Sequence, residues 1–125
     1  MKRIGKVILL FAAVLFLVIG LRWLVNPDGI VPEFGVVLGD GLGRSTQVGI
    51  FSAFFLTLGF CVLMALVSGR RVWYYPPVML LLLTATGRLL SWVAHDAAFA
   101  LGLIGIEVVV AALLLAASRW LAERD

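Results

Sequence analysis

Two charged residues, Arg88 and Glu107, lie inside long apolar stretches and are the strongest candidates for chemistry in this sequence. A lone charge at membrane depth costs about 2.5–3.5 kcal/mol even on the scale derived from insertion experiments, so each side chain needs a partner. With a turn centred near residue 96, an antiparallel hairpin places Arg88 opposite position 104 and Glu107 about 4.5 Å further along the axis. An arginine side chain can cover that offset, and we predict an Arg88–Glu107 ion pair.

The predicted pair has two interpretations. Intramembrane ionisable residues are functional hypotheses by default, so Glu107 could couple transport to ion binding. A neighbouring arginine opposes uptake of a proton by the carboxylate, however, and we favour a pair that stabilises the hairpin. Small residues next to the pair should let the helix backbones approach closely in lipid. The glycines predicted to form this packing face are Gly87, Gly102 and Gly105.

His95 and Asp96 follow the apolar stretch that contains Arg88 and could suggest acid-base chemistry or a metal site. The chain has one histidine and no second cluster of ligands, so we interpret the two residues as polar groups at the membrane interface. Asp96 is also placed to cap the amino end of the next helix. Neither a metal set nor an activated nucleophile is recognisable, and we expect no enzymatic activity and no cofactor.

Composition excludes an ordinary water-soluble fold, because 63% of the 125 residues are hydrophobic and the mean hydropathy is +1.14. The ten lysines and arginines are scattered at segment ends, which argues against a nucleic-acid binder. Four stretches approach the roughly 20 apolar residues that cross a bilayer core. We predict one domain, residues 1–125: an all-α, up-down bundle of four transmembrane helices, with an outer loop of about twenty residues between the first two. The predicted spans are residues 7–25, 46–67, 76–94 and 97–118.

The orientation follows from the positive charges, which are retained on the cytoplasmic side during insertion. Seven fall on one side of the predicted bundle, namely Lys2, Arg3, Lys6, Arg70, Arg71, Arg119 and Arg124, against Arg22 and Arg44 on the other. Both termini are therefore predicted to be cytoplasmic. Aromatic residues that prefer the interface agree with this orientation. They are Trp23 and Trp92 at the outer boundary and Trp73, Tyr74, Tyr75 and Trp120 at the inner one.

The order of several short motifs resembles a bacterial family of small four-helix membrane proteins, known mainly as a conserved domain of unknown function. The residues that carry the resemblance, over about the whole chain, are Asn26-Pro27, Gly87-Arg88-Leu89-Leu90-Ser91, Asp96 and Ile106-Glu107. The family often opens its second helix with an acidic residue and an arginine, whereas this chain has Thr46-Gln47-Val48-Gly49. The resemblance implies the fold and a bacterial inner-membrane location and supports the Arg-Glu pairing, but it supplies no activity.

The leading functional hypothesis is a non-catalytic accessory or scaffold subunit that docks onto a larger inner-membrane complex. Its expected partners are membrane lipids and other integral membrane subunits, with no nucleic acid. One alternative is a small transporter that acts as a homo-oligomer and uses Glu107 as its coupling acid. Another is a lipid or quinone binder with a cleft beneath the outer loop, near Trp92 and His95.

Overall fold

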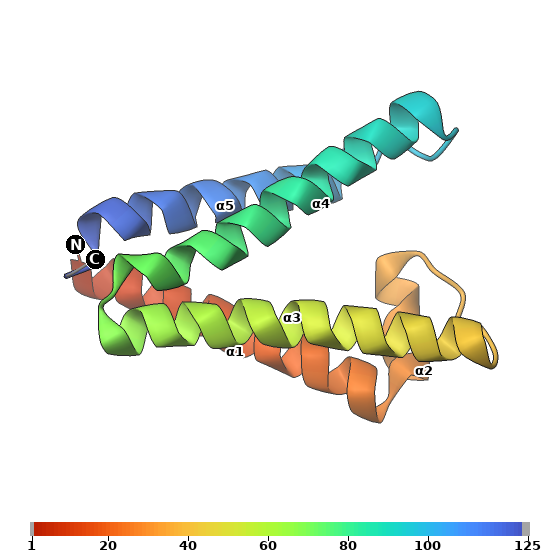
Figure 1. Ribbon diagram of the computed structural model, residues 1–125, viewed down its shortest axis with the longest axis horizontal. Coiled ribbons are helices and arrows are strands. Elements are labelled where there is room, and N and C mark those ends of the chain that lie inside the picture. Colours follow the sequence, from red (N-terminus) through yellow and green to blue (C-terminus); the bar gives the residue numbers. More distant parts are fainter. Residues whose placement is uncertain (1, 124–125) are drawn as a thin grey trace.

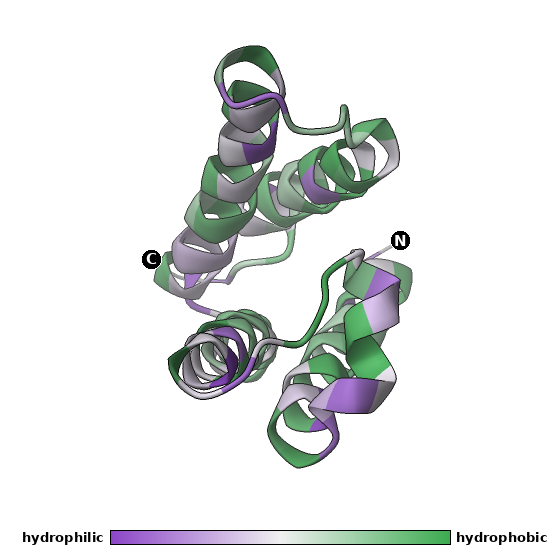
Figure 2. Ribbon diagram, turned by 90° about the vertical axis from the view of Figure 1, so that its right-hand side faces the viewer, coloured by the Kyte–Doolittle hydropathy of each residue, from purple (hydrophilic) through white to green (hydrophobic). Residues whose placement is uncertain are grey.

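The computed structural model describes residues 2–123 and is all-α, as predicted. Four of its helices are long and apolar enough to cross a membrane, as expected of a multi-pass membrane protein. Figure 2 shows hydrophobic residues, in green, along much of these helices. The long helices are α1 (Lys2–Val25), α3 (Leu42–Ser68), α4 (Tyr75–Ala94) and α5 (Leu101–Trp120). The short ones are α2 (Pro27–Ile30) and the 3-10 helices η1 (Val31–Phe34) and η2 (Arg71–Tyr74).

The helix boundaries differ from the predicted spans mainly at the amino ends. Helix α1 begins at Lys2 and α3 at Leu42, because polar residues can continue a helix beyond the apolar core that the pattern detects. Helix α4 begins at Tyr75 with prolines in its first turn, where the missing N–H groups have no intrahelical acceptor. Helix α5 begins at Leu101, so residues 95–100 form a longer connection than expected.

The long helices form two pairs, α1 with α3 and α4 with α5 (Figure 1). The start of α1 and the end of α5 lie at the same end of the molecule, which we call the terminal end. Helix α2 and residues 95–100 lie toward the opposite end, which we call the loop end. The pairs meet at the terminal end and separate toward the loop end (Figure 1). The bundle core therefore occupies the terminal half, and its buried residues come from the long helices and η2: Leu9, Ala13, Leu58, Val62, Ala65, Tyr74, Val78, Leu81, Ala111, Leu114 and Ala117.

Two glycines allow α1 and α3 to approach closely. A Cβ atom added to Gly59 would lie 2.8 Å from the backbone oxygen of Ala13, and one added to Gly20 would lie 2.9 Å from the backbone nitrogen of Leu56. Both distances are too short for a side chain. Ala13 and Gly20 are one heptad apart on α1, as are Ser52 and Gly59 on α3, and all four residues are buried. In lipid, where no hydrophobic effect drives helices together, such small residues favour close helix packing.

The connection from α1 to α3 folds back over the loop end of this pair. The Trp23 ring stacks on Phe51 at 4.5 Å between centroids, and Phe34 contacts Trp23 edge-on at 5.6 Å. An ion pair of 2.9 Å joins Arg22 Nη2 to Glu33 Oε2. The side chains of Phe34, Val36 and Leu38 pack against the buried cluster of Trp23, Ile30 and Val31, so this connection caps the α1–α3 pair.

Candidate functional site

Arg88 on α4 and Glu107 on α5 form an ion pair in the hairpin of these two helices. The Arg88 Nε group donates to both carboxylate oxygens of Glu107, each 3.1 Å away. Arg88 lies six residues before Ala94, the end of α4, and Glu107 lies six residues after Leu101, the start of α5. The two residues are thus level, about 9 Å inside the loop-end termini of their helices. The expected axial offset was wrong, because the connection is longer than predicted and moves the turn centre.

Arg88 and Glu107 lie on the same faces of α4 and α5 as the buried core residues of these helices. On α4, Arg88 follows the buried Leu81 by one heptad and the buried Ala85 by three residues. On α5, Glu107 precedes the buried Ala111 by four residues and Leu114 by seven. These spacings place the charges on the helix faces that form the core at the terminal end. At the level of the ion pair, however, the two helix pairs have separated (Figure 1).

The ion pair is consequently covered only in part. The side chain of Glu107 is 12% exposed and that of Arg88 is 30% exposed. A guanidinium group carries five N–H donors, and within residues 2–123 only Nε of Arg88 has an acceptor. The nearby hydroxyls of Thr84 and Thr86 donate to the backbone oxygens of Leu80 and Leu82 in their own helix. The Nη groups are thus able to bind a further acceptor.

The glycines that we expected to pack beside the ion pair do not do so. A Cβ atom added to Gly87, Gly102 or Gly105 would meet nothing within 4 Å, so these glycines face open space and the packing prediction was wrong. The close contact belongs instead to Gly20 and Gly59 in the other helix pair. Their heptad spacing from buried Ala13 and Ser52 was the signal in the sequence that could have found them.

His95 and Asp96 are exposed in the connection between α4 and α5, and Asp96 does not cap α5. That helix begins at Leu101, and its N-cap, Ala100, provides no side-chain hydrogen bond. Asp96 instead has a left-handed backbone, with φ of 57°, while the N–H groups of His95 and Ala97 both donate to the Ser91 oxygen. This arrangement ends α4. Among the described residues, no three potential ligands gather into a metal site.

The left-handed backbone of Asp96 leads to a prediction. Changing Asp96 to glycine should preserve stability or raise it by up to about 1 kcal/mol, because glycine adopts positive φ without a steric cost. Changing it to valine should lower the free energy of unfolding by about 1–2 kcal/mol. SDS titration followed by circular dichroism measures both, with His95→Ala as the neutral control. Equal losses of unfolding free energy in Asp96→Gly and Asp96→Val would show that the carboxylate itself stabilises the connection.

The aromatic residues expected at the membrane interfaces divide into two groups. Trp23 and Tyr74 are 0% and 1% exposed, so their prediction as interface anchors was wrong. Trp23 contacts the rings of Phe34 in the capping connection and Phe51 in α3, and its Nε1 has no hydrogen-bond acceptor among the described residues. Tyr74 belongs to the core, where η2 leads into α4. The remaining predicted anchors are exposed or partly buried near helix ends: Trp73, Tyr75, Trp92 and Trp120.

The connection that carries His95 also lies apart from α2 and η1 (Figure 1). Trp92 contacts Phe99, with ring centroids 4.6 Å apart, inside the α4–α5 hairpin. The capping connection between α1 and α3 therefore does not cover Trp92 or His95. The expected cleft beneath the outer loop is not confirmed, and the lipid- or quinone-binding alternative stays a prediction.

The fold and the ion pair define a multi-pass helical membrane protein with a charged pair between adjacent spans. Comparison with known protein families, curated proteins and solved structures finds no match for this chain. The resemblance to the family of small four-helix membrane proteins therefore stays a prediction.

Proposed function

We propose that the protein is a non-catalytic integral membrane subunit that docks onto a larger inner-membrane complex. The observation that carries the proposal is the 30% exposure of the Arg88 side chain, on an inward helix face and at membrane depth. Exposing a charge to lipid is unfavourable by about 2.5–3.5 kcal/mol at the helix centre. A partner helix that offered a carbonyl or carboxylate oxygen to the Nη groups would remove this cost.

The open loop end favours such docking. The α4–α5 hairpin contacts the α1–α3 pair at the terminal end, while beyond Ala85 its inward face is left for another helix (Figure 1). Within residues 2–123 the longest connection between long helices is residues 26–41, and part of it packs on Trp23. Contacts with a partner would therefore be made mostly inside the bilayer.

In the proposed orientation the terminal end is cytoplasmic. This end carries an excess of positive charge, as the cytoplasmic flanks of bacterial membrane proteins do. Arg124, which also supported this orientation, lies outside the described residues. The described basic residues near the terminal end are Lys2, Arg3, Lys6, Arg70, Arg71 and Arg119, whereas Arg22 and Arg44 lie toward the loop end.

Affinity purification of the tagged protein at native expression, in mild detergent, tests the proposal. We expect a stoichiometric larger partner in mass spectrometry and a matching complex size. The double variant Arg88→Leu/Glu107→Leu should lose this partner, because the polar contact is removed without leaving a lone charge. The matched control Arg22→Leu/Glu33→Leu, which removes the exposed ion pair of the connection, should retain it.

A lone monomer under these conditions would contradict the proposal. A self-associated species without another subunit would also contradict it, and would favour the homo-oligomeric transporter, in which Glu107 would act as the coupling acid. Glu107→Gln in a transport assay would then be the next measurement.

A further inference from the structure

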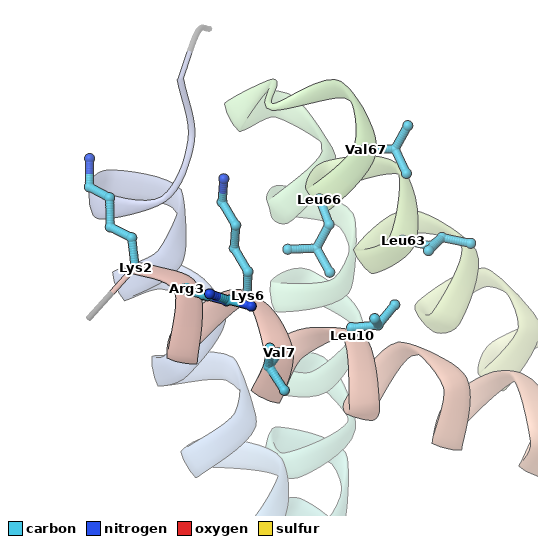
Figure 3. Close-up of a pocket in the computed structure, with 8 residues that line it drawn as sticks. All are labelled: Lys2, Arg3, Lys6, Val7, Leu10, Leu63, Leu66 and Val67. Atoms are coloured by element: carbon cyan, nitrogen blue, oxygen red, sulfur yellow. The ribbon is translucent and has the colours of Figure 1, made fainter.

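A groove runs between α1 and α3 at the terminal end of the molecule (Figure 3). Its volume is about 460 Å³. The residues that line it are Lys2, Arg3, Lys6, Val7 and Leu10 from α1 and Leu63, Leu66 and Val67 from α3. The ion pair of α4 and α5 lies toward the opposite end, so this groove is separate from the site described above (Figure 1).

The groove is basic at one end and apolar along the rest. Arg3, Val7 and Leu10 follow one another at helical spacing and form a single stripe on α1. Along this stripe the lining changes from cationic to aliphatic, and Lys2 and Leu10 lie about 12 Å apart along the helix axis. Figure 3 shows the Lys2 and Lys6 side chains extending to the same side of α1.

The cations at the groove are only partly neutralised. Lys6 Nζ lies 3.5 Å from Glu123 Oε1. Among residues 2–123, neither Lys2 nor Arg3 forms an ion pair. The positive charge therefore lies at the end of the helix pair, where we expect the headgroup layer, and it is available to a phosphate.

We propose that this groove binds an anionic glycerophospholipid, with its phosphate on Lys2 and Arg3 and one acyl chain along Val7, Leu10 and Leu63. Basic pockets between membrane helices at the cytoplasmic side recognise such headgroups. The apolar floor of the groove matches the acyl chain, and its cationic rim matches the phosphate. The two lie in the order in which a bilayer presents these parts of the lipid. The site does not depend on the proposed docking function.

A neighbouring groove provides a matched control. On its other side α1 forms a groove with α5, of about 780 Å³, which shares Lys2 but adds Arg119 instead of Arg3. Arg3→Gln and Arg119→Gln each remove one arginine from the terminal end, but only the first removes a residue that lines the proposed site. Val7→Trp should obstruct the acyl chain, and Val14→Trp makes the same change one heptad away, outside the groove.

Native mass spectrometry of the delipidated protein in a non-ionic detergent tests the site. Phosphatidylglycerol and phosphatidylcholine with identical acyl chains are the probes, and each variant is first checked for an unchanged circular-dichroism melt. We expect phosphatidylglycerol to bind more tightly than phosphatidylcholine. Arg3→Gln should weaken its binding about five-fold, the value of one basic residue near an anionic lipid. Val7→Trp should reduce retention of both lipids, while Arg119→Gln and Val14→Trp should leave binding unchanged.

Three results would overturn the proposal. Equal affinity for the two lipids would exclude headgroup selection. Equal losses in Arg3→Gln and Arg119→Gln would indicate general attraction to a basic surface. Displacement of phosphatidylglycerol by millimolar inorganic phosphate, with no effect of Val7→Trp, would indicate an anion site that makes no use of the apolar groove.

Discussion

Replacing Gly59 with leucine is expected to separate α1 from α3 and to lower the free energy of unfolding by about 3 kcal/mol. Even the first atom of the new side chain would lie 2.6 Å from Leu17 Cγ and 2.8 Å from the backbone oxygen of Ala13. The backbone atom cannot move without displacing α1. SDS titration in mixed micelles, followed by far-ultraviolet circular dichroism, measures the loss.

The matched control is Gly49→Leu, on the same helix. A Cβ atom at Gly49 meets nothing within 4 Å, so this change should alter stability by less than about 0.5 kcal/mol. Gly105→Leu on α5 should be equally mild for the same reason. A large loss in Gly105→Leu together with a small one in Gly59→Leu would restore the sequence-based prediction that close glycine packing belongs to the α4–α5 hairpin.

Changing Glu107 to glutamine is expected to lower the free energy of unfolding by about 2–3 kcal/mol, because Arg88 would stay charged at membrane depth without its carboxylate. The double variant Arg88→Leu/Glu107→Leu should recover most of this stability, since two apolar side chains suit the surrounding lipid. A double-mutant cycle on the purified protein, measured by the same SDS titration, gives the coupling energy of the pair.

The exposed pair Arg22–Glu33 is the control for this cycle. Its side chains are 44% and 58% exposed, so its coupling should be only about 0–1 kcal/mol. If Glu107→Gln proves as stable as the unchanged protein, the pair does not stabilise the hairpin, and a role for Glu107 in ion coupling becomes the better interpretation.

The four long helices and the pairing of Arg88 with Glu107 were accessible from the sequence because strong local constraints fix them. A span needs a minimum apolar length, and a charge at membrane depth needs a partner. Because the connection between these two spans is short, few residues of the second span lie close enough to pair with Arg88, and Glu107 is one of them. The register was less accurate, because α4 ends at Ala94 as predicted but α5 begins at Leu101, four residues later than expected, and composition does not reveal this longer connection.

The packing glycines could not be assigned from composition, because lipid-facing and protein-facing surfaces use the same apolar and small residues. Gly105 and Gly59 are both flanked by aliphatic or aromatic residues, yet only Gly59 has a helix against it. Trp23 illustrates the same difficulty at the interface. An aromatic ring near a span end favours the headgroup layer, but here Phe34 and Phe51 provide a competing aromatic environment inside the protein.

The pairing of α1 with α3 and of α4 with α5 also bears on biosynthesis. Each pair consists of long helices that are consecutive in the chain, so the first pair can assemble before the ribosome has completed the second. The order in which the spans leave the insertion machinery then matches the order in which they pack. The charged residue of α4 is the exception: Arg88 precedes Glu107 by 19 residues, so α4 reaches the insertion channel before its counter-charge does, and we expect α4 to stay in that polar environment until α5 arrives.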